Sequence, residues 1–155
     1  MFSGFLKKLL FAREFSIIDG EVKVLGNRYI MLPAELLFSA IKELDEKEIE
    51  SFSTNFIKNL MPRLAASGEG NITFITEIFD IYGLGKLSIE DINPKNKKAV
   101  LVLQDFPVLK NEKKNEIFLK LASSILVSYF SEFFHKRLSV KSTKISGSYA
   151  KFILG

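Results

Sequence analysis

The sequence predicts a single α+β domain in which an antiparallel β-sheet packs against a helical layer. Short β-prone runs come in pairs near both ends and in the middle of the chain, and strands joined by tight turns are antiparallel. Apolar residues at helical spacing occupy the segments between these pairs. The 155 residues are 47% apolar and 26% charged, which is a globular composition long enough for one core. No linker or repeat interrupts it, so the predicted domain is 1–155.

The N-terminal residues 1–10 are predicted to form an amphipathic segment. Their apolar side chains follow the i, i+3, i+4, i+7, i+8 spacing of one helix face, at Phe2, Phe5, Leu6, Leu9 and Leu10. Such a face could lie on a membrane. For so short a segment, packing on the domain or on a second subunit is the favoured reading. Lys7 and Lys8 stand inside the apolar run, which is a poor match to a secretory signal.

The next segment, "FSIIDGEVKVLG", predicts a β-hairpin turned at Asp19-Gly20, since Asp-Gly readily takes the positive φ of a tight turn. After "RYIMLP", Pro33 can open a helix because its missing N–H is not needed there. Residues 34–67 are then predicted to be mostly helical. Pro62 is predicted to end or kink that helix.

Residues 71–83 predict a shorter helix, capped by Asn71 and stopped at Gly83. Two strands at 86–92 and 98–105 follow, joined by a turn at residues 93–96. The segment 116–135 predicts a helix buried on most sides. It is not predicted to span a membrane, because Lys120, Glu132 and four serines interrupt a short run. Residues 137–145 and 148–154 form a last predicted hairpin around Ser146-Gly147.

Charge and cysteine content limit the chemistry of the protein. There are 15 Phe, no Trp and no Cys, which indicates an aromatic-rich core and excludes disulfides, thiolate catalysis and cysteine zinc sites. A cytoplasmic location is the expected one. Residues 1–80 hold 9 basic and 12 acidic side chains, a net charge of −3, and residues 81–155 hold 13 and 6, a net charge of +7. A basic second half suits an acidic partner or simply a solvated surface.

The segments that resemble reactive motifs favour structural roles. In "YGLGKLS", the glycines follow a helix and enter a strand, whereas a phosphate-binding loop opens a helix. We expect a helix C-cap there. His135, which is the only histidine, stands at the end of a predicted helix, where a cation interacts well with the helix dipole. One histidine without a metal-ligand spacing predicts neither a metal site nor a nucleophile triad.

Two charged groups were candidates for function. Glu43, Glu46 and Glu50 share a predicted helix face, and paired carboxylates can perform acid–base chemistry when burial separates their pKa values. The nearby Lys42 and Lys47 favour a solvated, ion-paired face instead. The second group is a basic series with no acid between its members: Lys136, Arg137, Lys141, Lys144 and Lys151. Tyr149 and Phe152 are its only interleaved aromatic residues, and it has no helix-turn-helix signature, so nucleic-acid binding is not predicted.

The last candidates for a functional site are phenylalanines on predicted helix faces. They could line a cavity for an apolar ligand, or they could form plain core or a dimer interface. The members are Phe38, Phe56, Phe74, Phe79, Phe118, Phe130, Phe133 and Phe134.

The order of elements resembles the four-vinyl-reductase domain family, which is related in fold to the TRAPP vesicle-tethering subunits. The resemblance spans about residues 11–155 and rests on "RYIMLP", "IYGLGKLSIEDINPKNKKAVLVLQDFPV", the apolar helix and "LSVKSTKISGSYAKFIL". The family hairpin has the form Cys-x-x-x-Gly-x-x-x-Cys-x-Phe. Gly147 matches its glycine, while Thr143 replaces the first cysteine and Lys151 or Ala150 the second. Both family cysteines are thus replaced in this chain. The metal or redox chemistry that they would imply is therefore not expected here.

The resemblance implies a homodimer and a hydrophobic pocket able to hold a fatty acid or another apolar small molecule. The first hypothesis is accordingly a non-enzymatic binding or sensing domain without cofactor or metal. Its predicted lining residues are Phe56, Phe79, Tyr82, Leu126, Tyr129 and Phe133. The alternative is a protein-interaction or scaffold module like the tethering subunits, with a protein partner and the phenylalanines packed as core and dimer interface. No residue or motif in the sequence supports the hypothesis of an enzyme.

Overall fold

The computed structural model describes residues 15–18, 21–24, 27–29, 33–66, 72, 74–106 and 112–155. The chain divides into two compact units, Met1–Leu37 and Phe38–Gly155. The predicted amphipathic segment 1–10, the Asp19-Gly20 turn and the Asn71 cap lie outside the described residues. Whether one domain extends over 1–155 stays a prediction.

The first unit contains a three-stranded antiparallel sheet in the order β1-β2-β3, formed by β1 (Phe15–Ile18), β2 (Glu21–Val24) and β3 (Asn27–Tyr29). Ile18 pairs with Glu21, so two residues connect β1 and β2 as the Asp-Gly signal predicts. The hairpin is confirmed. The third strand was not predicted from "RYIMLP", since three residues are too few to show an alternating pattern.

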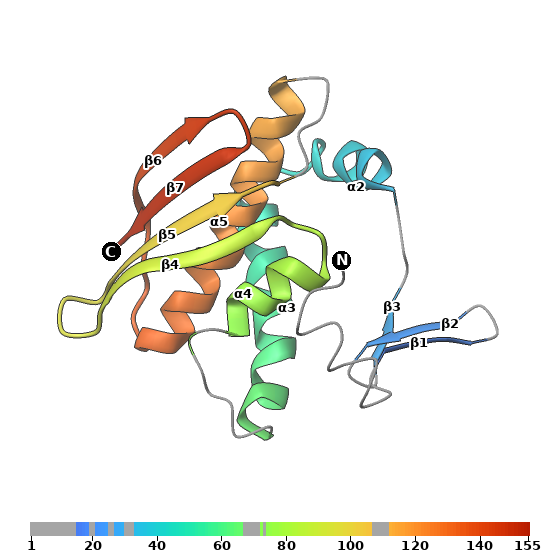
Figure 1. Ribbon diagram of the computed structural model, residues 1–155, viewed down its shortest axis with the longest axis horizontal. Helices are drawn as coiled ribbons and strands as arrows, with labels where there is room; N and C mark the ends of the chain where they lie inside the picture. The colour runs from blue at the N-terminus through green and yellow to red at the C-terminus, as the bar shows by residue number, and fades with distance from the viewer. Residues whose placement is uncertain are drawn as a thin grey trace. The chain divides into compact units, whose positions relative to one another are not determined.

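The second unit is built around a four-stranded antiparallel sheet in the order β4-β5-β7-β6 (Figure 1). Helix α2 crosses the boundary between the units. The predicted α+β class with an antiparallel sheet is confirmed, as are the two strand pairs of this unit. The bounds are α2 (Ala34–Ile41), α3 (Glu46–Ala66), α4 (Phe74–Ile81), β4 (Lys86–Asn93), β5 (Lys98–Gln104), α5 (Glu112–Phe134), β6 (Val140–Ser146) and β7 (Tyr149–Leu154).

The long helical region predicted over 34–67 is two helices, because Asp45 begins a new one. The backbone N–H of Glu48 donates to Asp45 Oδ1 at 2.8 Å, and the Asp45 N–H donates to Glu48 Oε2 at 2.7 Å. This reciprocal capping box satisfies two amides at the start of α3. Of the two outcomes predicted at Pro62, the end of the helix is wrong, since α3 continues to Ala66, and the kink stays a prediction.

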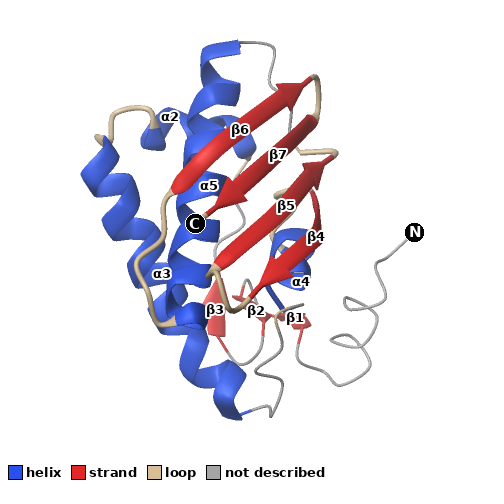
Figure 2. Ribbon diagram, turned by 90° about the vertical axis from the view of Figure 1, so that its left-hand side faces the viewer, coloured by secondary structure: helices blue, strands red, loops and turns tan. Residues whose placement is uncertain are grey.

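Helix α5 lies along one face of the four-stranded sheet, with α3 beside it (Figure 2). Strand β7 shows the matching alternation: Ala150, Phe152 and Leu154 are buried, and the residues between them are half-buried. Phe152 pairs with Leu101 of β5, so both strands direct apolar side chains to the same face. Strand β6 is different, because Ile145 pairs with the buried Ala150 but is itself 56% exposed.

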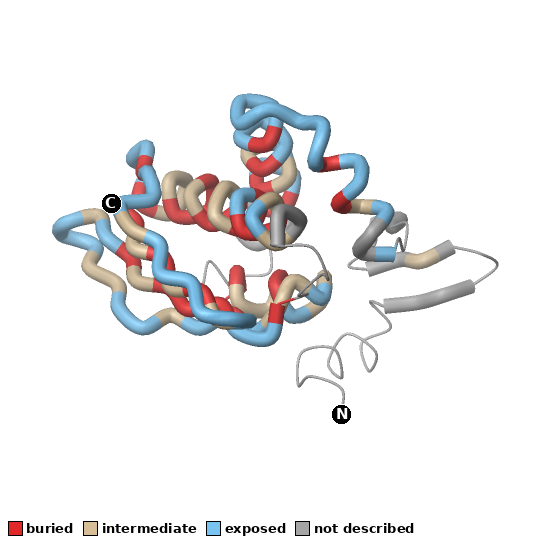
Figure 3. The backbone as a smooth tube through the Cα atoms, turned by 90° about the horizontal axis from the view of Figure 1, so that it is seen from above, coloured by how far each residue is buried: buried red, intermediate tan, exposed pale blue. Residues whose placement is uncertain are grey.

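The predicted burial of α5 explains its apolar composition. Among the described residues, Asn115–Phe134 is the one helical stretch long and apolar enough to cross a membrane by length and composition. In the structure 56% of that window is buried inside the protein. Phe118, Leu126 and Phe130 are fully buried, and Figure 3 shows the buried positions of the helix facing the sheet layer. A helix covered on most sides requires apolar residues around most of its circumference.

The α3–α5 interface contains a buried hydroxyl. Ser53 lies in the apolar stripe of α3 between Ile49 and Ile57 and is 0% exposed. Its Oγ has no hydrogen-bond partner among the described residues. A buried donor without a partner loses the hydration that it has in the unfolded chain.

We therefore expect Ser53→Ala to raise the free energy of unfolding by about 1 kcal/mol more than Ser51→Ala does. Ser51 is exposed on the same helix, so this control carries the same gain in helix propensity without the change in burial. Urea unfolding of both variants measures the difference. Equal effects of the two substitutions would show that the buried hydroxyl costs nothing.

Candidate functional site

The six residues predicted to line a ligand site come from three helical segments. Phe56 lies in the middle of α3, and Tyr82 directly follows α4. The structure brings these two rings together, with centroids 5.6 Å apart and planes at 72°. This is the edge-to-face arrangement that aromatic rings favour. The Tyr82 N–H still donates to the Ile78 carbonyl at 3.1 Å, so the helical geometry of α4 holds the tyrosine.

The six positions fall into two classes of burial. Phe79 and Leu126 are fully buried, and Tyr129 is 3% exposed. Phe56, Tyr82 and Phe133 are half-buried. The fully buried members belong to the close-packed core. The half-buried members have ring surface that remains accessible to another molecule.

The aromatic residues of α5 form a continuous cluster along the helix. The Phe130 ring centroid lies 5.4 Å from that of Tyr129, 6.4 Å from Phe133 and 6.0 Å from Phe134. This cluster contains two of the predicted lining residues, Tyr129 and Phe133. Which of the six residues touch a ligand stays a prediction.

Burial raises the pKa of the Tyr129 phenol from 10.0 to about 12. The ionised form is disfavoured where water is excluded. The unfolded chain then releases this proton at lower pH than the native chain does. Well below pH 10 the phenol is neutral in both the native and the unfolded state, so its effect on stability is confined to the alkaline range.

We expect the free energy of unfolding to fall more steeply between pH 10 and about 12 in the wild-type protein than in Tyr129→Phe. Denaturant unfolding at a series of pH values measures both slopes. Subtracting the slope of Tyr129→Phe from that of the wild type removes the contribution of all other titrating groups. Parallel curves for the two proteins would exclude a raised pKa at Tyr129.

A separate pocket of about 480 Å³ lies between α3 and the C-terminal end of α5. We call it the polar pocket. None of the six predicted residues belongs to it. Its lining residues are Glu50, Thr54, Val127, Ser128, Ser131, Glu132, His135, Lys136, Arg137 and Leu138.

Hydroxyl groups form part of the polar pocket. Thr54 Oγ1 of α3 and Ser128 Oγ of α5 lie 3.3 Å apart, within hydrogen-bonding distance. Ser131 Oγ accepts the backbone N–H of Leu138 at 3.0 Å, which ties the loop after α5 to the helix. Sequence reasoning treated the serines of α5 only as interruptions of an apolar run. Their i, i+3 spacing on one helix face was the available signal.

His135 directly follows Phe134, the last residue of helix α5. Its φ is 50°, its N–H donates to the Glu132 carbonyl at 3.1 Å, and the Lys136 N–H donates to the Ser131 carbonyl at 3.0 Å. These two bonds form a Schellman motif with His135 at the left-handed position. The predicted capping position is confirmed. The cation bonded to a carbonyl of this helix end is Lys97, whose Nζ donates to the Phe134 carbonyl at 2.9 Å.

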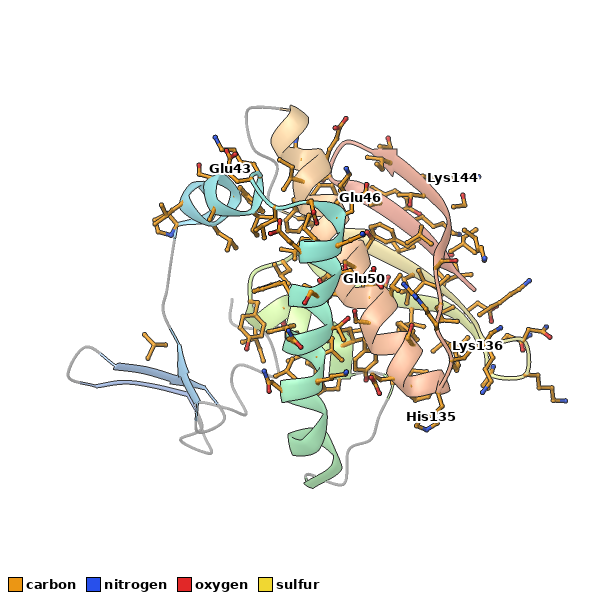
Figure 4. The ribbon with its side chains drawn as sticks, turned by 180° about the vertical axis from the view of Figure 1, so that it is seen from behind. Glu43, Glu46, Glu50, His135, Lys136 and Lys144 are labelled. Carbon is orange, nitrogen blue, oxygen red and sulfur yellow. The ribbon has the colours of Figure 1, made fainter. Side chains whose placement is uncertain are left out.

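The three glutamates of the acidic run, labelled in Figure 4, pair with separate partners. Glu43 pairs with Lys42 at 3.2 Å, Glu46 with Lys120 at 3.5 Å, and Glu50 with Arg137 at 2.9 Å. Glu43 precedes α3, so the three glutamates do not share one helix. The prediction that these glutamates are solvated and ion-paired is confirmed, but the predicted single helix face is wrong, and two of the three bases come from α5 and the loop after it.

The "YGLGKLS" segment is the predicted helix cap. Gly83 has a φ of 65°, its N–H donates to the Asp80 carbonyl at 3.2 Å, and the Leu84 N–H donates to the Phe79 carbonyl at 2.8 Å. The chain then enters β4 at Lys86. The segment therefore closes α4 rather than opening a phosphate-binding helix.

The basic series does not form one continuous patch. Arg137 pairs with Glu50, and Lys151 of β7 pairs with Glu90 of β4. Hydrogen bonding to Glu90 raises the pKa of the Lys151 ammonium. Lys144 lies directly opposite Lys151 on β6, and Lys141 falls at an irregularity of the same strand. Two of the five cations are thus ion-paired.

Comparisons with known proteins identify the fold. No protein-family model and no curated protein sequence matches the chain. A solved structure of the phenol-responsive sensory domain of the transcription activator PoxR, bound to phenol, superposes with a TM-score of 0.64 at 16% identity. The superposition covers 99% of this chain and 90% of that one. A trafficking protein particle complex subunit 3 from Naegleria fowleri, covalently bound to palmitic acid, gives 0.47 at 10% identity, covering 80% and 82%.

At such identities the PoxR likeness establishes fold and no more. The resemblance noticed in the sequence is thereby supported at the level of a related fold, while membership of the four-vinyl-reductase family stays a prediction. The elements of this chain superpose on those of the PoxR domain along nearly the whole chain.

Proposed function

We propose that the chain is a non-enzymatic small-molecule-binding or sensing domain whose ligand is aromatic or otherwise apolar. The half-buried pair of Phe56 and Tyr82 carries this proposal. The fold shared with a phenol-responsive sensory domain supports it, since a common architecture can place a ligand in a common region.

The aromatic pair offers the chemistry that such a ligand requires. Two rings already in edge-to-face contact present apolar edges and faces to a third ring. The Tyr82 hydroxyl adds a polar group that can orient a phenol or a carboxyl. Binding here requires less rearrangement of the core than binding against Phe79 or Leu126, which are fully buried.

The test uses purified protein with phenol and palmitate as probes. Native mass spectrometry and solvent extraction first establish whether the protein carries an apolar molecule. Isothermal titration then measures the affinity of each probe for the wild type, Phe56→Ala and Phe52→Ala. We expect at least about a tenfold loss of affinity in Phe56→Ala, which is worth about 1.4 kcal/mol, and no loss in Phe52→Ala.

Phe52 is the matched control because it lies one turn earlier on α3 and is 50% exposed. Phe56→Leu serves as a second variant that keeps an apolar side chain if the alanine variant folds poorly. Protein that releases no apolar molecule and binds neither probe contradicts the proposal. Equal affinities in all variants contradict the assignment to the aromatic pair.

A protein-interaction module is the second candidate, and exposed apolar side chains favour it. Phe52 on α3 and Ile145 on β6 are both more than one third exposed, and covering such side chains with a partner stabilises the complex.

We propose a cytoplasmic homodimer for either function. Light scattering measures its mass directly, and a monomer at all concentrations contradicts the dimer.

A further inference from the structure

The polar pocket differs in chemistry from the aromatic pair. It is large enough for a small metabolite, because ligand sites have volumes of about 300–1,000 Å³. Its lining includes two carboxylates, two permanent cations and three hydroxyls, with only Val127 and Leu138 as apolar members. An apolar ligand would cover the charges of Glu132 and Lys136 without pairing them.

The charges of the polar pocket balance, but they are not all paired. Arg137 and Glu50 form an ion pair across it, from the loop after α5 to α3. Glu132 and Lys136 form no ion pair with any described residue and lie near the same end of α5. Figure 4 shows Glu50 on α3, and His135 and Lys136 where α5 ends. A carboxylate and an ammonium are thus both available to a bound molecule.

This balance selects the class of ligand. A simple anion would face two glutamates and the negative end of the α5 dipole. A simple cation would face Lys136 and Arg137. A molecule with both charges can place its ammonium at Glu132 and its carboxylate at Lys136, which makes two charge-assisted hydrogen bonds. Val127 and Leu138 can then cover a short aliphatic side chain.

From this arrangement we propose that the polar pocket binds a small zwitterion of the α-amino-acid class, independently of any ligand at the aromatic pair. Glu132 binds the ammonium group, and Lys136 binds the carboxylate. Thr54, Ser128 and Ser131 provide the hydroxyl surface between them. The proposed aromatic ligand and the proposed zwitterion contact different residues. An experiment can therefore contradict one of the two proposals without contradicting the other.

The test compares three probes that share one aliphatic skeleton: leucine, its deaminated analogue 4-methylpentanoate and its decarboxylated analogue 3-methylbutylamine. Amide chemical shifts of the full chain are recorded during titration with each. We expect leucine alone to shift the amides of residues 127–138 and of Thr54. Its affinity should fall at least about tenfold in Glu132→Gln and in Lys136→Met, as expected for the loss of a charge-assisted hydrogen bond.

Lys144→Met is the matched control, because Lys144 is an exposed lysine on β6 outside the polar pocket. It should bind leucine as the wild type does. The proposal is overturned if leucine shifts none of these amides at millimolar concentration. It is equally overturned if either single-charge analogue binds as well as leucine, or if Glu132→Gln or Lys136→Met retains the wild-type affinity.

Discussion

Phe118→Ala should lower the free energy of unfolding by about 3–5 kcal/mol, the range for truncating a fully buried phenylalanine. Phe118 is 0% exposed. Its ring stacks on Phe106, with centroids 5.4 Å apart, and meets the edge of Phe38 at 5.5 Å. The side chain thus joins α5 to the end of β5 and to α2. Its removal leaves a cavity that three separate segments must close.

Denaturant unfolding of Phe118→Ala measures this loss, with Phe52→Ala as the control. The exposed Phe52 should change stability by no more than about 0.5 kcal/mol, as surface substitutions do. A small domain has a total stability of about 5–15 kcal/mol, so at the low end of that range the alanine variant retains little native protein. Phe118→Leu leaves a smaller cavity and should lose less. Similar losses in Phe118→Ala and Phe52→Ala would contradict the packing described for the core.

Gly85→Ala should be the second most damaging substitution, with a loss of about 3 kcal/mol. Gly85 has a φ of 110°, where a side chain is strained by about 1–3 kcal/mol. A Cβ at this position would lie 2.7 Å from the Gln104 carbonyl oxygen and 2.9 Å from the Phe106 Cα. Both are backbone atoms, so the contact can be relieved only by moving the end of β5, which adds a cost of overpacking.

Gly83→Ala and Gly147→Ala separate these two contributions. Both glycines have positive φ, 65° and 57°, but a Cβ at either would meet no atom within 4 Å. Each substitution should therefore cost only the left-handed strain of about 1–2 kcal/mol. Thermal or urea unfolding of the three variants gives the order. If Gly85→Ala loses no more free energy of unfolding than Gly83→Ala does, the end of β5 moves at no measurable cost.

Local patterns identified most elements of the second unit. The strands of the middle and last hairpins, the cap at Gly83 and the buried helix α5 all follow from short-range signals of alternation, turn residues and helical spacing. The break between α2 and α3 was missed, although Asp45 and Glu48 carry the capping-box spacing. Apolar residues stand on both sides of that break, at Ile41, Leu44 and Ile49, and so conceal it.

The candidate sites were less accessible to sequence reasoning. Helical spacing identified Phe56 and Tyr82 as members of apolar faces, but it could not show that their rings meet or that both stay half-buried. The polar pocket combines residues 50–54 with residues 127–138. Neither segment has a recognisable motif of its own, so nothing short of the α3–α5 packing predicts their meeting.

By itself, the sequence determined the α+β class, the antiparallel pairing within hairpins, the aromatic core and the absence of thiol chemistry. Those properties depend on residue types and on neighbours only a few positions apart. The tertiary structure decided which half of a helix face becomes core, which ion pairs form, and where polar groups enclose a pocket. Those properties depend on contacts between α3, α5 and the sheet, such as the pairing of Glu50 with Arg137, and close packing rather than local spacing sets which side chains meet.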